Sequence, residues 1–184
     1  MDNQTIYWIE KFFSDFGSSN YYGENVSQYE HAAQCALLAI QNTTCQETQI
    51  AAFLHDIGHF LPDVQTDSMN EFGNVNHEKV AADWLLSHGF SHKIASIVEN
   101  HVFAKRYLCT TNPAYYSSLS DASKITLQFQ GGLLNEYEQA EFQKHPFFSE
   151  SLQVRHWDDQ AKVVGMKLPN IHFFLSICKQ YLIQ

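Results

Sequence analysis

The sequence places side chains that can bind a metal at regular intervals. His31, the adjacent pair His55 and Asp56, then His77 and His101 follow one another at offsets of 24, 22 and 24 residues. Such offsets are expected when sequential antiparallel helices meet at one depth of a bundle. Four imidazoles and a carboxylate, without thiolates, suit iron, manganese, zinc or nickel. The spacing therefore predicts a metal centre inside a helical protein.

The stretch AAFLHDIGHF, residues 51–60, carries the His-Asp pair between apolar residues. In a helix, His55 and His59 would project from one face about 6 Å apart, with Asp56 about 100° round the axis. Gly58 would cost about 1 kcal/mol in a helix interior, and its missing side chain would let another element or a ligand approach. For this stretch taken alone, the alternative is that His55 and His59 are hydrogen-bonded core histidines and that Asp56 is an internal cap.

Helices must position these residues, because apolar residues recur at helical spacing and no convincing two-residue alternation occurs. The fold class is therefore all-α, and residues 1–184 are expected to form a single domain. Capping boxes and single N-caps mark the early helix starts, and proline and glycine bound the later helical regions. The expected starts and regions are Ser27–Glu30, Thr44–Glu47, Asn76, Ser91, 113–129, 136–144, 147–162 and about 170–183.

Composition narrows the class of protein. The hydrophobic fraction of 45% and the net charge of −9 indicate a globular protein that does not coat nucleic acid or anionic membranes. No apolar run reaches the roughly 18 residues of a membrane span, and the N-terminus lacks the basic start of a signal peptide. The four cysteines are dispersed, which excludes a cysteine-rich zinc site and favours a cytoplasmic setting. Oligomeric state is not readable.

The ordered set of histidines and aspartates resembles the HD-domain superfamily, and in particular its binuclear subset. Within it the sequence is most similar to the mixed-valence di-iron oxygenases that cleave carbon–phosphorus bonds, relatives of myo-inositol oxygenase that act on 2-amino-1-hydroxyethylphosphonate. The matching motifs span residues 21 to 158, ahead of a C-terminal helix at about 170–183. They are YYGE at 21–24, HDIGH at 55–59, HVFAKRYL at 101–108, LSDASKITLQFQGG at 119–132 and VRHWD at 154–158.

The resemblance implies two iron ions, Fe(II) and Fe(III), with O₂ as co-substrate. It assigns His31, His55, Asp56 and Asp158 to one iron, and His77, His101 and the bridging Asp56 to the other. By spacing alone, Asp159 competes with Asp158 as the late ligand. The register of the VRHWD motif favours Asp158.

The resemblance also implies residues around the metals. Lys105 and Arg155 each share a helix face with an expected ligand and would bind a phosphonate dianion; solvated salt bridges are the alternative. Tyr21 would guard an iron position, although Tyr22 is a competitor, and an ordinary loop is the alternative for this region. The implied catalytic residues are Tyr21, Glu24 and His59, and the implied substrate-binding residues are Lys105, Ser123, Thr126, Arg155, His59 and Glu24.

We therefore expect an oxygenase that uses O₂ to cleave the C–P bond of a 1-hydroxyphosphonate. (R)-2-amino-1-hydroxyethylphosphonate, yielding glycine and phosphate, is the favoured substrate, and a trimethylammonium analogue stays open. A metal-dependent HD phosphohydrolase acting on a phosphate ester or nucleotide is the alternative. A metal-binding module without catalysis is a third reading.

Overall fold

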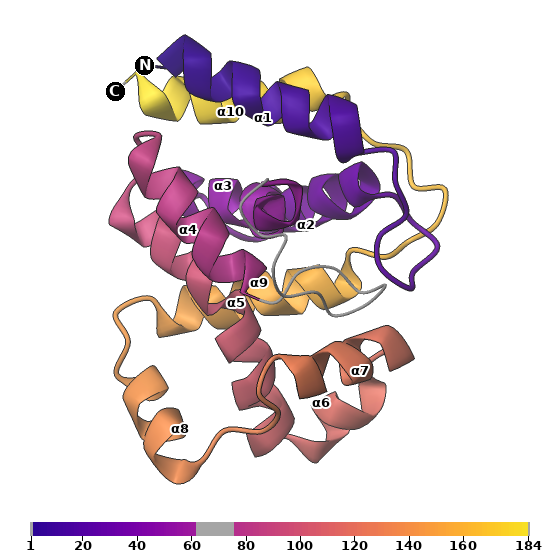
Figure 1. Cartoon of the computed structure of the whole chain (residues 1–184), viewed down its shortest axis with the longest axis vertical. Helices are drawn as coiled ribbons and strands as arrows, with labels where there is room; N and C mark the ends of the chain where they lie inside the picture. The colour runs from indigo at the N-terminus through magenta and orange to yellow at the C-terminus, as the bar shows by residue number, and fades with distance from the viewer. Residues whose placement is uncertain (1, 62–75, 184) are drawn as a thin grey trace.

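The computed structural model describes residues 2–61 and 76–183, which form α-helices, one short 3₁₀ helix (η1) and no strand (Figure 1). This confirms the all-α class. The helices are α1 Asp2–Phe16, α2 Gln28–Asn42, α3 Gln46–Leu54, η1 Ile57–Phe60, α4 His77–Ser87, α5 His92–Thr111, α6 Pro113–Ser118, α7 Asp121–Phe129, α8 Glu136–Gln143, α9 Phe148–Gln160 and α10 Ile171–Leu182.

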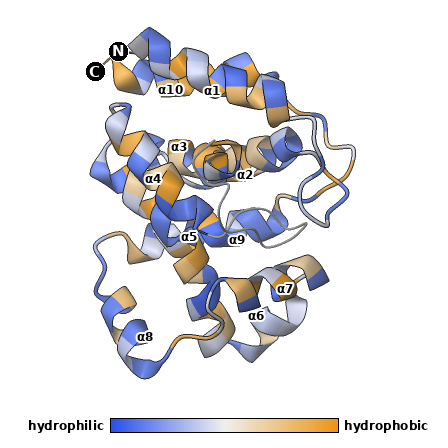
Figure 2. Ribbon diagram, viewed as in Figure 1, coloured by the Kyte–Doolittle hydropathy of each residue, from blue (hydrophilic) through white to orange (hydrophobic). Residues whose placement is uncertain are grey.

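Helix α5 runs through the middle of the molecule and contacts α3, α4, α6 and α9 (Figure 1). Helices α1 and α10 pack together at one end of the view, and α6, α7 and α8 lie at the other. Most helices carry both polar and apolar segments (Figure 2), as amphipathic helices do. In the described ranges no helix is both long and apolar enough to cross a membrane.

The main hydrophobic core joins α1 and α10 to the helices that carry the histidines. Phe53 of α3 stacks between Phe13 of α1 and Phe174 of α10, with ring centroids 5.0 and 4.8 Å away. A second, smaller cluster around Leu127 fastens α7 to the far end of α5. The histidine-bearing segments therefore sit between two apolar clusters that fix them.

Two of the expected helix starts are confirmed. Ser27 and Glu30 form a capping box in which the Ser27 side chain accepts from the Glu30 amide and the Glu30 carboxylate accepts from the Ser27 amide. The Ser91 hydroxyl accepts from the Ile94 amide at the start of α5. These caps set the angles at which α2 and α5 deliver His31 and His101.

At two other expected starts a helix begins at or near the expected residue, but the expected side-chain cap is absent. The Thr44–Glu47 capping box is absent: α3 begins at Gln46, its N-cap Cys45 makes no side-chain cap bond, and the Glu47 carboxylate instead accepts from Ser91. Asn76 precedes α4 in the left-handed conformation, with φ of 63°, and its side chain caps nothing. Asparagine tolerates that backbone region, so it serves here as a turn residue.

The stretch HDIGH is not one helix, as the sequence predicted, but a helix end followed by a tighter turn. Helix α3 ends at Leu54, Asp56 is outside any helix, and Ile57–Phe60 form η1. A Cβ atom added to Gly58 would lie 1.9 Å from the backbone oxygen of His77. The glycine therefore permits the predicted close approach, and the approaching element is the start of α4.

Helix α1 was not predicted from the sequence. Its buried residues Thr5, Ile9 and Phe13 recur every four positions, which is the signal that would have identified it. The region 113–129 is confirmed as helical but is divided in two, since Ser120 caps α7 by accepting from the Ser123 amide.

We predict that Gly58→Ala lowers the free energy of unfolding by about 2 kcal/mol or more, because the new methyl group collides with the α4 backbone. Urea denaturation of metal-free protein measures the loss. Gly165→Ala is the control: no heavy atom lies within 4 Å of its Cβ, so only its φ of +72° is strained, at about 1 kcal/mol. Equal losses in both variants would contradict the steric explanation.

Candidate metal centre

The structure gathers the five residues of the histidine pattern at one buried point. His31 comes from α2, His55 from the end of α3, His77 from the first position of α4 and His101 from the middle of α5. Each imidazole is at most 3% exposed, and Asp56 is 7% exposed. Burial on this scale means that every polar atom needs a partner.

Backbone carbonyls fix the orientation of three imidazoles. The Nδ1 atoms of His31, His55 and His101 lie 3.0, 2.9 and 2.7 Å from the carbonyl oxygens of Ala161, Ala52 and Val98. A carbonyl can only accept, so Nδ1 carries the proton and Nε2 presents a lone pair. This is the arrangement found behind metal-binding histidines.

The Nε2 atoms converge in two pairs on the two oxygens of one carboxylate. His31 and His55 Nε2 lie 3.2 Å apart and 3.6 and 3.2 Å from Asp56 Oδ2. His77 and His101 Nε2 are also 3.2 Å apart, and they lie 3.3 and 3.4 Å from Asp56 Oδ1. Ligands about 2.1 Å from a metal are spaced by about 3 Å. The two groups could therefore each hold one ion, with Asp56 shared between them.

Asp158, and not Asp159, reaches this point from α9. Its Oδ1 lies 3.4 Å from His31 Nε2 and its Oδ2 lies 3.9 Å from His55 Nε2. Asp159 turns away, accepting from the Tyr115 hydroxyl at 2.5 Å and from Arg155. Of the two aspartates that spacing left open, Asp158 is the one whose carboxylate lies beside the imidazoles.

Unsatisfied oxygens mark the same point. Among the described residues, Asp56 Oδ2 and Asp158 Oδ1 are buried without a hydrogen-bond partner. Burial raises the pKa of Asp56, but the neighbouring His55, His101 and His77 hold it well below its usual range. Two anionic carboxylates and converging imidazole lone pairs fit divalent or trivalent metal ions with nitrogen and oxygen preference.

Tyr21 covers the centre from the loop before α2. Its ring stacks on His31 with centroids 3.7 Å apart, and burial, with the charges of Asp56 and Asp158, raises the pKa of its phenol well above the usual value. Tyr22 packs edge-on against His59 instead, 4.8 Å between centroids. Of the two competing tyrosines, Tyr21 is the one that lies against the centre.

A small cavity of about 50 Å³ opens beside the centre and is lined by Lys105 from α5. The Lys105 ammonium is buried and donates to the Thr126 hydroxyl at 2.7 Å and to the Gln130 side-chain oxygen at 3.0 Å. Burial, together with the charge of Arg155, lowers its pKa to about 7. Both acceptors are neutral, so among the described residues this cation faces the cavity without a hydrogen-bonded carboxylate.

Arg155 also lines the cavity, but its charge is already balanced. Its Nη1 lies 2.6 Å from Asp158 Oδ2, and its other nitrogens contact Asp159. Although burial opposes the charged form, these carboxylates hold the pKa of Arg155 well above its usual value. The salt bridge foreseen as an alternative role is present, but it is buried and supports a candidate metal ligand.

The remaining predicted residues surround the same cavity. Ser123, Thr126, His59 and Glu24 all line it, so the structure brings together every site residue that the sequence predicted. His59 stacks on His77 with centroids 3.9 Å apart; burial, with the nearby His77, lowers its pKa well below the usual value.

Sequence reasoning missed several lining residues, above all Lys162, whose ammonium lies 2.7 Å from Glu24 Oε1. Its position four residues after Asp158 was the available signal. The expected helix over 147–162 would have put Lys162 on the same face as Asp158, whereas α9 ends at Gln160 and Lys162 reaches the cavity from the segment that follows it. The other missed residues are Val102, Ala122 and Gln130, whereas Tyr22, considered only as a competitor of Tyr21, also lines the cavity.

An all-helical fold around two histidine–aspartate groups defines a metal-binding HD-domain protein, and residues 29–128 match the family model described as HD domain. A hydroxymethylphosphonate dioxygenase of Gimesia maris is 42% identical over 88% of this chain and 80% of its own. A 1-hydroxy-2-(trimethylamino)ethylphosphonate dioxygenase (glycine-betaine-forming) of Leisingera caerulea is 38% identical over 95% and 89%. An uncharacterized protein of Acanthamoeba polyphaga mimivirus is 38% identical over 97% and 82%. The chain belongs to the HD-domain family, in the group that contains these phosphonate dioxygenases.

We predict that Asp56→Ala removes both metal ions and that His101→Ala removes one, because only the carboxylate belongs to both groups. Metal per chain, measured by inductively coupled plasma mass spectrometry after iron loading, should fall from about two to near zero and to about one. His172→Ala, at an exposed side chain, should leave the content unchanged. Equal metal loss in the Asp56 and His101 variants would contradict the shared carboxylate.

Proposed function

We propose that the protein is an oxygenase that uses O₂ to cleave the C–P bond of a 1-hydroxyphosphonate. The observation that carries this proposal is the buried ammonium of Lys105. Its hydrogen-bond acceptors among the described residues are neutral, and it faces a cavity beside a two-metal ligand set. An anion entering the cavity would provide the missing countercharge. The named activities of the two phosphonate dioxygenases support the same chemistry.

His31, His55, Asp56 and Asp158 would hold one iron ion, and His77, His101 and Asp56 the other. When bound, a mixed-valence Fe(II)/Fe(III) pair would supply the redox chemistry that O₂ needs. The second group has fewer protein ligands, which leaves room for small molecules. Arg155 would hold the Asp158 carboxylate in place, since one guanidinium nitrogen lies 2.6 Å from it.

Around the centre, the chain would bind and orient the substrate. Lys105 would donate to the phosphonate oxygens, with the Thr126 and Ser123 hydroxyls alongside. Tyr21, stacked on His31, would exclude water from the centre until substrate displaces it. His59 would face the cavity as a neutral imidazole, because burial lowers its pKa. Positioning and charge neutralisation are thus the protein's part of the reaction.

The proposed reaction balances without another reductant. The C1–H and C–P bonds break, C1 gains one oxygen and becomes a carboxylate, and phosphorus gains the other and becomes phosphate. One proton is released, and O₂ accepts all four electrons. Any 1-hydroxyphosphonate can follow this course. The primary-amine substrate favoured by the sequence, (R)-2-amino-1-hydroxyethylphosphonate, would give glycine and phosphate.

We predict that iron-loaded protein releases phosphate from a 1-hydroxyphosphonate in air and not under nitrogen. Phosphate and the matching carboxylate should form in equal amounts and with equal consumption of O₂, measured with an oxygen electrode. Phosphate release from phosphate esters under nitrogen, with none from 1-hydroxyphosphonates in air, would instead support the phosphohydrolase.

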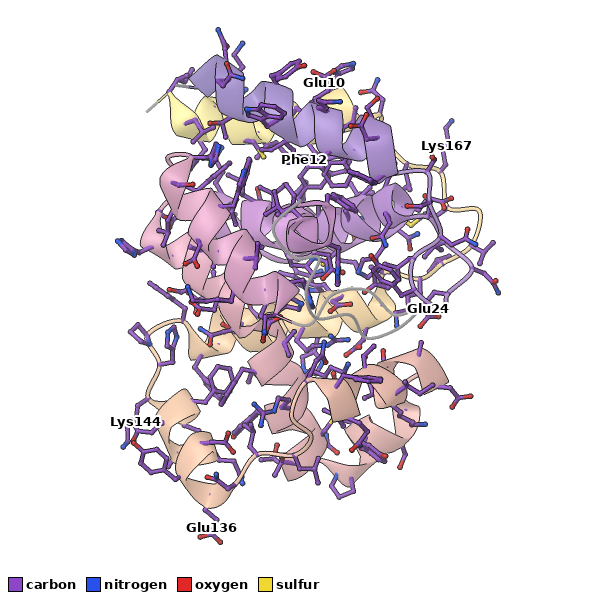
Figure 3. All side chains as sticks on the ribbon, viewed as in Figure 1. Glu10, Phe12, Glu24, Glu136, Lys144 and Lys167 are labelled. Carbon is purple, nitrogen blue, oxygen red and sulfur yellow. The ribbon has the colours of Figure 1, made fainter. Side chains whose placement is uncertain are left out.

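Lys105→Met should lower kcat/KM by roughly 10- to 100-fold, because one or more charge-assisted hydrogen bonds to the phosphonate are lost. Methionine keeps much of the volume of the side chain, so folding should persist, as checked by circular dichroism. Lys144→Met is the matched control: Lys144 is exposed just after the end of α8 (Figure 3), and it pairs with Glu141. Equal activity in the two variants would remove Lys105 from the substrate site.

A further inference from the structure

Glu24 and Lys162 form an ion pair at the wall of the cavity. The Lys162 Nζ lies 2.7 Å from Glu24 Oε1, and each side chain is only 16% exposed. The Ser120 hydroxyl donates to the same carboxylate oxygen at 2.7 Å. Glu24, labelled in Figure 3, lies on the loop before α2, whereas Lys162 follows α9. Two segments far apart in the chain therefore meet through this pair.

Among the described residues that line the cavity, three carry carboxylates: Asp56, Asp158 and Glu24. Asp56 lies among the four imidazoles, and Asp158 lies against His31 and Arg155. Glu24 is therefore the carboxylate left to receive a positively charged substituent of a substrate. In this structure its charge is already balanced by a residue of the chain itself.

A substrate ammonium group at Glu24 would have to displace the Lys162 ammonium or lie beside it. Displacement would break a partly buried ion pair, and coexistence would bring two like charges within a few ångströms. A displaced Lys162 would also give up its contacts with the Ser123 and Ser120 hydroxyls, which lie 3.4 and 3.5 Å from its Nζ. Both courses disfavour a cationic substrate.

A phosphonate whose substituent carries no positive charge meets neither penalty. It leaves the Glu24–Lys162 pair intact, and the position of Lys162 beside Ser123 then places a second cation close to the cavity in addition to Lys105. Both contributions favour a compact phosphonate dianion without a positive end.

We propose that the Lys162 ammonium occupies the position that a substrate ammonium would take, so that the enzyme prefers 1-hydroxyphosphonates with no cationic substituent, such as hydroxymethylphosphonate. Lys162 is then a specificity-determining residue. The inference rests on the proposed function and replaces the amine-bearing substrate by one without a cationic substituent.

The test compares three substrates, of which two are equal in size. (R)-1-hydroxypropylphosphonate carries a methyl group where (R)-2-amino-1-hydroxyethylphosphonate carries an ammonium, and hydroxymethylphosphonate carries neither. Phosphate release by iron-loaded protein in air should show a kcat/KM that is roughly tenfold or more higher for the two substrates without an ammonium group than for the amine. Lys162→Met should shift the methyl-to-ammonium ratio by roughly tenfold toward the amine. Lys162→Arg, which keeps the cation, should retain the preference, and Lys144→Met should leave the ratio unchanged.

Binding gives a readout independent of turnover. Propylphosphonate and 2-aminoethylphosphonate lack the 1-hydroxyl group and have equal numbers of heavy atoms. Calorimetry under nitrogen should show tighter binding of propylphosphonate to the native protein and a loss of that difference in Lys162→Met. A native preference for the amine, or a ratio that Lys162→Met does not change, would overturn the inference and leave the oxygenase intact. No O₂-dependent phosphate from any of the three substrates would overturn the proposed function and this inference with it.

Discussion

The arrangement of the helices depends on one buried carboxylate, that of Asp56, facing four imidazoles. Its two oxygens each meet a pair of Nε2 atoms, at 3.2 to 3.6 Å. A buried carboxylate is costly unless it is fully compensated. Four separate segments must therefore reach one point, and the apolar clusters on either side of the centre hold them there. The break in α3 at His55 and the close approach of α4 at Gly58 both serve this convergence.

Helix α9 carries both the candidate metal ligand Asp158 and the cavity residue Arg155, and the two form an ion pair. Arg155 joins Asp158 to Asp159 within one turn, and Tyr115 fixes Asp159 from outside that helix. The charge of Asp158 is therefore paired with Arg155, and Arg155 is itself held by Asp159. Lys105 differs from Arg155, because its hydrogen-bond acceptors among the described residues are neutral. Arg155 is thus the cation that stabilises the site, and Lys105 is the one suited to bind an anion.

Much of this site was predictable from the sequence, because histidine offsets and helix caps are local patterns. His31, His77 and His101 lie where regular helices put them. The break after Leu54 was not predictable, since the reason for it, the approach of α4 to Gly58, is a tertiary contact. The choice between Asp158 and Asp159 needed the direction of α9 as well as its spacing. Lys162 was missed although the expected helix put it four residues after Asp158, because its role at the cavity depends on a tertiary contact with Glu24 beyond the actual end of α9.

The buried oxygens of Asp56 and Asp158 that lack hydrogen-bond partners also bear on the lifetime of the protein in a cell. A chain that buries anionic ligands binds metal only when folded, so each bound ion lowers the population of the unfolded form by mass action. Proteases act on that unfolded form. The abundance of this protein would thus follow the supply of metal, with scarcity leading to turnover of the empty chain by degradation.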